Sequence, residues 1–126
     1  MQRQLRLQCF GTQANVMGDR ELLKELLENL VQNAIRYNKE GGFVQVTVKE
    51  NQGHPSLTVE DGGIGIPEEA QDRVFERFYR VDKSRSRETG GTGLGLAIVK
   101  HIAQIHGARI TLESKLGQGT RIAVIF

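Results

Sequence analysis

The chain has 126 residues, of which 38% are hydrophobic and 25% are charged, and this composition suits one globular domain. Its 17 basic and 15 acidic residues leave a net charge of +2, which is too small to indicate binding to nucleic acid or to an anionic membrane. The single cysteine excludes an internal disulfide, and no apolar run reaches the roughly 18 residues of a membrane span. No signal-peptide pattern opens the chain. We therefore expect one soluble, cytoplasmic domain over residues 1–126.

Hydrophobic periodicity predicts two elements in the first part of the chain. Apolar residues alternate with polar ones over 2–9, which indicates a half-buried strand. Asp19 is a typical helix cap, and the helix that it starts should end near Tyr37, before a Gly-Gly pair. The apolar face of this helix repeats as adjacent pairs: Leu22, Leu23, Leu26, Leu27, Leu30, Val31, Ala34 and Ile35.

The middle of the chain reads as a strand, a turn and a second strand. Valines alternate over 44–48, a turn is expected over 51–55, and a further strand over 57–60 runs directly into Asp61. Pro67 is then expected at the first position of a helix, where its missing N–H costs nothing.

The last third begins with a segment that shows no apolar periodicity. Residues 80–92 are rich in charge and glycine, and we expect a mobile loop there. Helical spacing resumes over 93–106, and strands are expected at 110–112 and 122–126 on either side of a glycine turn.

The spacing of the strands predicts the fold class. The strand pairs at 43–60 and 108–126 are separated as hairpins are, while helices lie between them in the sequence. This favours an α+β two-layer sandwich, with a mixed, mainly antiparallel sheet and helices on one face.

The helix that starts at Asp19 carries polar residues that its stability does not require. Asn29 and Asn33 lie one turn apart beside the apolar face, with Glu25 a turn earlier and Arg36 and Tyr37 just after. One interpretation is that these side chains are solvated or bond their own backbone. The other is a site for a metal ion and phosphate, because an amide oxygen can bind Mg²⁺ without repelling a polyphosphate and arginine pairs with phosphate oxygens.

The segment Asp61-Gly-Gly-Ile-Gly-Ile66 directly follows a predicted strand. Asp-Gly is a common turn pair, so a simple turn is the alternative interpretation. Three glycines in four residues exceed what a turn requires, and they indicate close approach of another group to the backbone. A carboxylate at the end of a buried strand needs a donor, and the exocyclic amine of a nucleobase is a suitable one.

A second glycine-rich segment, residues 90–96, ends the charged loop and opens the last helix. Helix N-termini present unpaired N–H groups, and glycines allow a phosphate to approach them. The segment lacks the Gly-Lys-Ser/Thr of a P-loop, and no strand precedes it as the dinucleotide fingerprint requires. The chain also lacks the His-Arg-Asp and Asp-Phe-Gly motifs of serine, threonine and tyrosine kinases.

The order of these motifs resembles the catalytic ATP-binding domain of two-component sensor histidine kinases. Residues 25–37 resemble the N box of that family, and residues 61–66 its first glycine box. Val74-Phe-Glu-Arg-Phe-Tyr-Arg80 resembles the F box, 91–96 the second glycine box, and 117–120 the last glycine turn. The shared Arg-Phe-Tyr-Arg-Val-Asp stretch is most similar to the phosphate- and cell-wall-stress sensors.

The resemblance implies the Bergerat ATP-binding fold, shared with gyrase, Hsp90 and MutL, with ATP and Mg²⁺ as cofactors. Asn33 would hold the metal, Asp61 would take the adenine amine, and residues 80–92 would form a lid over the nucleotide. The positions that would contact the cofactor are Asn29, Asn33, Arg36, Tyr37, Asp61, Gly63, Gly65, Ile66, Gly91, Thr92, Gly93, Leu94, Gly95 and Thr120. Phe75 and Phe78 would either anchor the lid, as in the family, or form part of the core.

The resemblance also implies a partner, because the family's phosphoacceptor histidine lies in a separate helical-hairpin dimerisation domain. His54, His101 and His106 do not have its sequence context, so the γ-phosphate would pass to another domain of a parent protein. Glu25 would orient or deprotonate that histidine, with Asn29 and Arg36 also catalytic. A response regulator would act through the parent, which the resemblance places in the bacterial inner membrane. A nucleotide-binding module without transfer activity and a gyrase/Hsp90-type ATPase remain the alternatives.

Overall fold

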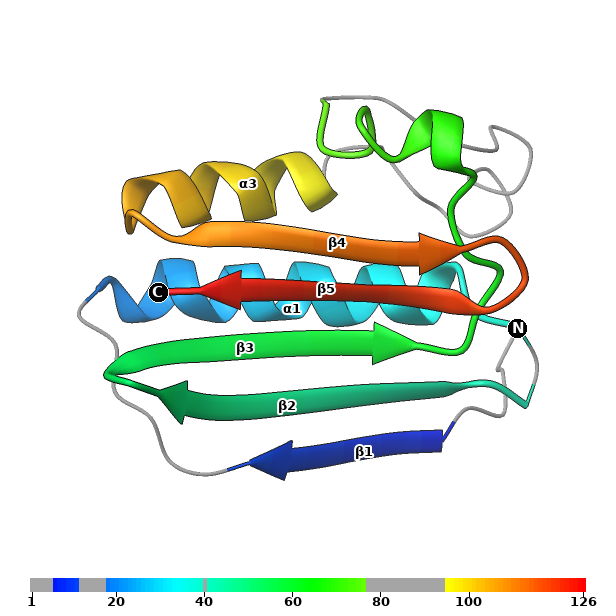
Figure 1. Cartoon of the computed structure of the whole chain (residues 1–126). Helices are drawn as coiled ribbons and strands as arrows, with labels where there is room; N and C mark the ends of the chain where they lie inside the picture. Colours follow the sequence, from blue (N-terminus) through cyan, green and yellow to red (C-terminus); the bar gives the residue numbers. More distant parts are fainter. Residues whose placement is uncertain (1–5, 12–17, 40, 77–94) are drawn as a thin grey trace.

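The computed structural model describes residues 6–11, 18–39, 41–76 and 95–126, which form one sheet and the helices packed on it (Figure 1). The elements are β1 (Arg6–Gly11), α1 (Arg20–Arg36), β2 (Phe43–Asn51), β3 (His54–Asp61), the 3₁₀ helix η1 (Glu68–Ala70), α3 (Gly95–Ile105), β4 (Arg109–Lys115) and β5 (Gly119–Ile125). No helix in these ranges is both long and apolar enough to cross a bilayer.

The five strands lie in the order β1-β2-β3-β5-β4, and only the β1–β2 pair is parallel. The two hairpins expected from the sequence are present as β2–β3 and β4–β5. The turn expected over 51–55 was too wide, however. Gln52 and Gly53 both adopt positive φ, 54° and 80°, which is the geometry of a two-residue hairpin turn. The antiparallel pairing of β2 with β3 therefore continues to Asn51 and His54.

Helix α1 has the limits that the sequence predicts. The Asp19 carboxylate accepts hydrogen bonds from the N–H groups of Glu21 and Leu22, at 2.9 and 3.2 Å, and so satisfies two donors of the first turn. Tyr37 follows the last helical residue, and its N–H bonds the carbonyl of Asn33 at 3.1 Å.

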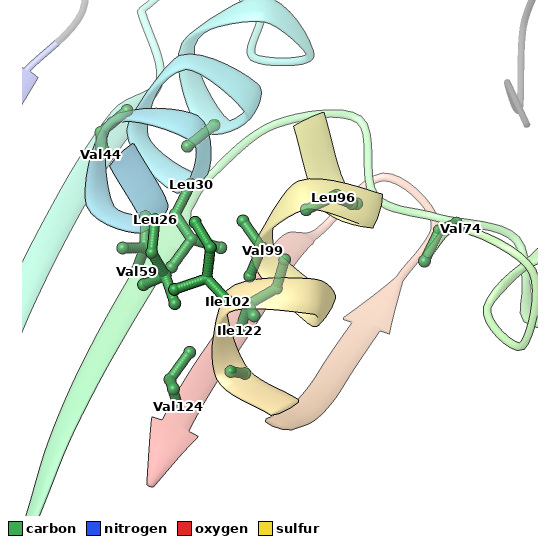
Figure 2. Close-up of a cluster of buried hydrophobic side chains, with 12 residues drawn as sticks. Leu26, Leu30, Val44, Val59, Val74, Leu96, Val99, Ile102, Ile122 and Val124 are labelled. Carbon is green, nitrogen blue, oxygen red and sulfur yellow. The ribbon is translucent and has the colours of Figure 1, made fainter. Parts of the chain in front are cut away.

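The hydrophobic core lies between helices α1 and α3 and one face of the sheet, as Figure 2 shows. Leu26 and Leu30 of α1 and Ile102 of α3 are at most 2% exposed. They meet inward-facing strand residues, namely Val44, Val59, Ile122 and Val124. Together with the strand order, this arrangement confirms the predicted α+β two-layer sandwich.

The ends of the two helices are joined through His106. Its Nε2 accepts a hydrogen bond from the N–H of Asp19 at 3.1 Å, so the proton of the neutral ring resides on Nδ1 and is donated to the carbonyl of Ile102 at 2.8 Å. The ring also packs edge-on against Phe126. His106 thereby holds the end of α3 against the start of α1.

Two sequence predictions are corrected in detail, and the structure bears on a third that was left open. The first strand ends at Gly11 and not at residue 9, and its expected start at residue 2 lies outside the described residues. Pro67 precedes η1 as its cap and is not its first residue, and η1 is one short turn. Phe75 is partly buried and packs against the hydrophobic core, while Phe78 lies outside the described residues.

Candidate functional site

The candidate site lies at the end of the sheet where β3 ends and β4 turns into β5. Figure 1 shows the C-terminal end of α1 at this end of the molecule and the start of α3 directed toward it. Three residues lie side by side there in the strand register, Asp61 on β3, Thr120 on β5 and Ser114 on β4. Asp61 and Thr120 are only 7% and 8% exposed, so the sheet buries two polar side chains at this point.

Burial controls the chemistry of Asp61. Loss of water raises the pKa of this carboxyl to about 6, although the N–H groups of Gly63 and Thr120 lower it and the charge of Glu60 adds a small increase. The Gly63 N–H lies 2.9 Å from Asp61 Oδ1. Among the described residues no cation forms an ion pair with Asp61, so the carboxylate retains acceptor capacity for a ligand.

The glycines after Asp61 are required by the packing of the chain itself. A Cβ at Gly63 would collide with the carbonyl of Tyr37, and one at Gly65 would collide with the carbonyl of Lys115. Gly65 also has a φ of 76°, which side chains rarely adopt. The loop after β3 is thus pressed between the end of α1 and the β4–β5 turn, while a close approach of ligand to these glycines stays a prediction.

A network of polar groups holds this loop against β4. Ser114 Oγ lies 2.8 Å from the N–H of Ile66, 2.8 Å from the carbonyl of Gly119 and 2.9 Å from Thr120 Oγ1. The Gln71 amide donates to the carbonyls of Ile66 and Ser114, both at 3.0 Å. Side chains from β4 and from the end of η1 therefore hold the loop after β3 next to the register pair Asp61 and Thr120.

The C-terminal end of α1 is held against the same loop. The Ile64 N–H donates to the carbonyl of Tyr37 at 3.2 Å. Asn38, which has no exposed surface, donates from Nδ2 to the carbonyl of Phe43 at 2.8 Å and accepts from the N–H of Lys39 at 2.9 Å. These bonds replace the helical bonds that end here, and they fix Tyr37 relative to Asp61.

The polar residues of α1 lead from this junction toward the start of α3. Asn29 Nδ2 donates to the carbonyl of Glu25 at 2.8 Å, the backbone bond that the sequence left as an alternative. Its Oδ1 would lie 3.4 Å from a Cβ at Gly95, so the amide oxygen is beside the first turn of α3. Asn33 and Arg36 are half-buried on the turns between Asn29 and Tyr37. The helix thus connects both glycine-rich elements.

An open hollow of about 520 Å³ lies beside Asp61, a volume in the range of small-molecule sites. Its walls come from β3, β4, β5, the turn between β4 and β5, and Gln71. They include Thr120 and Ser114 together with the charged residues Glu60, Glu113 and Arg121. None of the polar residues of α1 lines it, so the hollow accounts for the Asp61 end of the site alone.

These groups fit an adenine nucleotide with a magnesium ion. A buried acceptor suits an amino group, and a helix start such as that of α3 suits phosphate because helix N-termini present N–H groups. Within the described ranges no three His, Cys, Asp or Glu side chains come together as a metal site. Mg²⁺ bound to a polyphosphate needs only one or two protein oxygens, however, and the amides of Asn29 and Asn33 can supply them.

Comparison with known families identifies the chain. One family, described as histidine kinase-, DNA gyrase B-, and HSP90-like ATPase, has a sequence model that matches residues 18–126. The chain belongs to this ATPase family.

The curated relatives of this ATPase-family domain are sensor kinases. The chain is 52% identical over 105 residues to the sensor-like histidine kinase SenX3 of Mycolicibacterium smegmatis, covering 83% of the chain and 27% of the relative. It is 45% identical over 125 residues to the sensor histidine kinase YkoH of Bacillus subtilis, covering 99% and 27%. The chain therefore spans about a quarter of the length of these relatives.

Solved structures agree with the assignment. The mycobacterial sensor histidine kinase MprB matches with a TM-score of 0.83 and 31% identity, over 97% of this chain and 80% of that one. Full-length ShkA, solved in complex with AMPPNP, matches with a TM-score of 0.80 and 28% identity, over 96% of this chain and 25% of that one.

Within the described residues of the ATPase-family domain, some of the positions predicted from the sequence lie in two groups, and their contacts with a nucleotide stay a prediction. Asp61, Gly63 and Thr120 are in contact, Tyr37 contacts the loop after β3, and Asn29 lies beside Gly95. Four predicted contact residues, Gly91, Thr92, Gly93 and Leu94, and the expected lid over 80–92 lie outside the described residues.

Sequence reasoning missed three residues that build the site. Asn38 carried a signal, since a polar residue between a helix end and a Gly-Gly pair is a typical turn former. Ser114 and Gln71 carried none, because a serine in a strand and a glutamine after a short helix are ordinary surface residues. Their roles depend on the contact of β4 with the loop after β3, which the strand order alone determines.

Proposed function

We propose that this domain binds Mg·ATP and donates the γ-phosphate to a histidine on a separate phosphoacceptor domain of its parent protein, in two-component signal transduction. The observation that carries the proposal is the buried carboxylate of Asp61 at one end of a polar path that continues along α1 to Asn29 and Gly95. The path has an acceptor for the base at one end and a helix start for the phosphates at the other.

Each residue of the path has a role that its chemistry supports. Asp61, assisted by Thr120, accepts hydrogen bonds from the adenine amine, and Tyr37 flanks the base or the ribose. Asn33 holds Mg²⁺, and Asn29 and Arg36 contact the phosphates. The metal neutralises the charge that develops on the transferred phosphoryl group. In this proposal, residues 91–95 contact the phosphates and the lid at 80–92 covers the nucleotide.

Transfer to histidine is favoured over hydrolysis by the residue at position 29. An ATPase that activates water needs a general base there, and the Asn29 carboxamide does not accept a proton at neutral pH. An imidazole is already a nucleophile at this pH, so positioning and charge balance carry most of the catalysis. Glu25 is exposed one turn before Asn29, where it orients or deprotonates the incoming histidine.

The proposed partners follow from the length of the relatives. The chain covers 27% of SenX3 and of YkoH, both named as histidine kinases, so the rest of such a protein has ample room for a helical-hairpin domain. The domain then acts in the cytoplasm, its parent is anchored in the bacterial inner membrane, and a response regulator receives the phosphoryl group through the parent.

A phosphotransfer assay tests the proposal. The domain is mixed with the histidine-bearing hairpin domain of its parent, MgCl₂ and ATP labelled at the γ-phosphate, and acid-labile, base-stable label on the hairpin is expected. Asn33→Ala should abolish the label because it removes the metal ligand. Gln32→Ala, an exposed neighbour on the same helix, should keep it.

The other outcomes separate the alternatives. ATP that binds without either label or phosphate release would leave a nucleotide-binding module. Release of inorganic phosphate without label on the hairpin would point to a gyrase/Hsp90-type ATPase. An intact fold that binds no adenine nucleotide in excess Mg²⁺ would rule out all three functions.

A further inference from the structure

The hydroxyl of Ser114 has three polar neighbours but a single proton to donate. It lies 2.8 Å from the Ile66 amide nitrogen, 2.8 Å from the Gly119 carbonyl oxygen and 2.9 Å from Thr120 Oγ1. All three distances are those of good hydrogen bonds, and the group is half-buried between β4, β5 and the loop after β3.

Proton accounting determines the direction of each bond. An amide N–H can only donate, so Ser114 Oγ accepts from Ile66. A carbonyl can only accept, so the single proton of Ser114 must go to Gly119, since two bare oxygens at 2.8 Å would repel each other. Nothing is left to donate to Thr120. Thr120 Oγ1 is therefore the donor in its contact with Ser114 and the serine oxygen is the acceptor.

This direction decides what Thr120 offers to the hollow beside it. Its only proton is directed toward β4, and its oxygen therefore presents lone pairs alone. Asp61, its register partner on β3, is also an acceptor when ionised. Both residues line the same hollow. A ligand group that meets this pair must be a donor, whereas a carbonyl oxygen would face two acceptors without a proton between them.

We propose that Ser114 is a positioning residue for base selection, which fixes the hydrogen-bond direction of Thr120 and so favours a purine with an amino group at C6 over one with a carbonyl. The inference rests on the proposed function, because it takes a purine nucleotide as the ligand of the hollow. It assigns the discrimination to a residue that need not contact the base.

The test is the ratio of affinities for ATP and inosine triphosphate, measured by calorimetry with Mg²⁺ on the full chain. The two ligands share ribose and phosphates, so any general loosening of the loop cancels in the ratio. Ser114→Ala frees the Thr120 hydroxyl to donate to a carbonyl, and the preference for ATP should fall by about tenfold. Ser114→Thr keeps the hydroxyl and should restore the preference. Ser56→Ala, at a serine on β3 whose hydroxyl bonds the Lys49 carbonyl, should leave the ratio unchanged.

A double variant checks that Ser114 acts through Thr120. Thr120→Val removes the acceptor, and adding Ser114→Ala to it should then change the ratio no further. An effect of Ser114→Ala that persists in the Thr120→Val background would overturn the proposal, as would an unchanged ratio in Ser114→Ala alone.

The unmodified protein offers a measurement that does not depend on variant folding. Purine riboside triphosphate carries neither amine nor carbonyl at C6, so the expected order of affinity is ATP, then this analogue, then inosine triphosphate. Inosine triphosphate binding more tightly than the analogue would contradict two acceptors in the hollow. A chain that binds no purine triphosphate would sink the proposed function itself, whereas ATP binding with the wrong order would sink only the role of Ser114.

Discussion

Three rows of side chains cross β3, β5 and β4 on the face that bears the helices, and they differ in kind. The row of Leu57, Val124 and Ile110 and the row of Val59, Ile122 and Leu112 are apolar and pack into the core. The next row along the same face is Asp61, Thr120 and Ser114. The strands, the register and the alternation are the same in all three rows, and only the chemistry changes.

The difference between the rows separates the part of the sheet that stabilises the fold from the part that is proposed to bind a ligand. The two apolar rows gain free energy from burial. Burial removes water from the Asp61 carboxylate in the polar row and raises its pKa, and the hydrogen bonds from the Gly63 and Thr120 N–H groups offset only part of this effect. A fold that needed stability alone would continue the apolar pattern. The proposed function places the amino group of adenine at this polar row.

The largest expected effect comes from breaking an apolar row. Ile122→Ala removes a side chain that is 4% exposed and should lower the free energy of unfolding by about 2–5 kcal/mol, measured by urea denaturation. Ile105→Ala, at a position 56% exposed on α3, should cost less than about 0.5 kcal/mol. Equal losses at the two positions would mean that the apolar rows are not the core.

The polar row should give the protein an unusual pH dependence. The pKa of Asp61 is about 6 in the folded protein against an ordinary 3.8, so the folded state binds this proton more tightly than the unfolded state does. Protonated Asp61 therefore stabilises the folded state below about pH 4, and this stabilisation is lost as the pH rises through 6. The free energy of unfolding should fall by on the order of 3 kcal/mol over that range. The measurement is the unfolding free energy of the protein minus that of Asp61→Asn from pH 4 to 7. A flat difference would contradict the burial of this carboxylate.

Asp61→Asn should separate binding from stability. We expect a loss of about 10- to 100-fold in ATP affinity, because a charge-assisted hydrogen bond to the amine is replaced. Stability at pH 7 should rise, since no charge is buried. Glu50→Gln changes an exposed carboxylate at the opposite end of the β2–β3 hairpin and should alter affinity less than about threefold. Similar losses in both variants would indicate a general charge effect, and calorimetric titration with Mg·ATP distinguishes the two results.

The smallest expected effect comes from Gln71, whose hydrogen bonds hold the loop after β3 against β4 beside the polar row. Gln71→Ala removes two hydrogen bonds, to Ile66 and Ser114, and should lower the unfolding free energy by about 1 kcal/mol. Gln104→Ala, on the exposed side of α3, should leave it unchanged. Thermal denaturation of both variants provides the comparison. If the Gln71 hydrogen bonds stabilise the fold, Tm should fall in Gln71→Ala and stay unchanged in Gln104→Ala.

Much of the fold could be predicted because its signals are local. The cap at Asp19, the paired apolar residues of α1 and the alternating valines of β2 depend on neighbours within one turn or one strand. The limits of the β2–β3 turn could not be predicted, because Gln52 takes a left-handed conformation that its residue type does not favour. Pro67 was placed one position wrong for a similar reason, as caps and first turns have the same local preferences.

The sequence by itself determined the helices, the strand pairs, the fold class and the residue types of the nucleotide motifs, because helical and strand periods and turn chemistry act over a few residues. Only the tertiary structure decided that Ser114, Thr120 and Asp61 form one row, that Gln71 braces it and that Asn38 fastens α1 beside it. Those contacts join residues up to 59 positions apart, such as Asp61 and Thr120, and depend on the placement of β5 between β3 and β4. Hydrogen-bond partners at that separation have no signature in the residues that lie next to them in the chain.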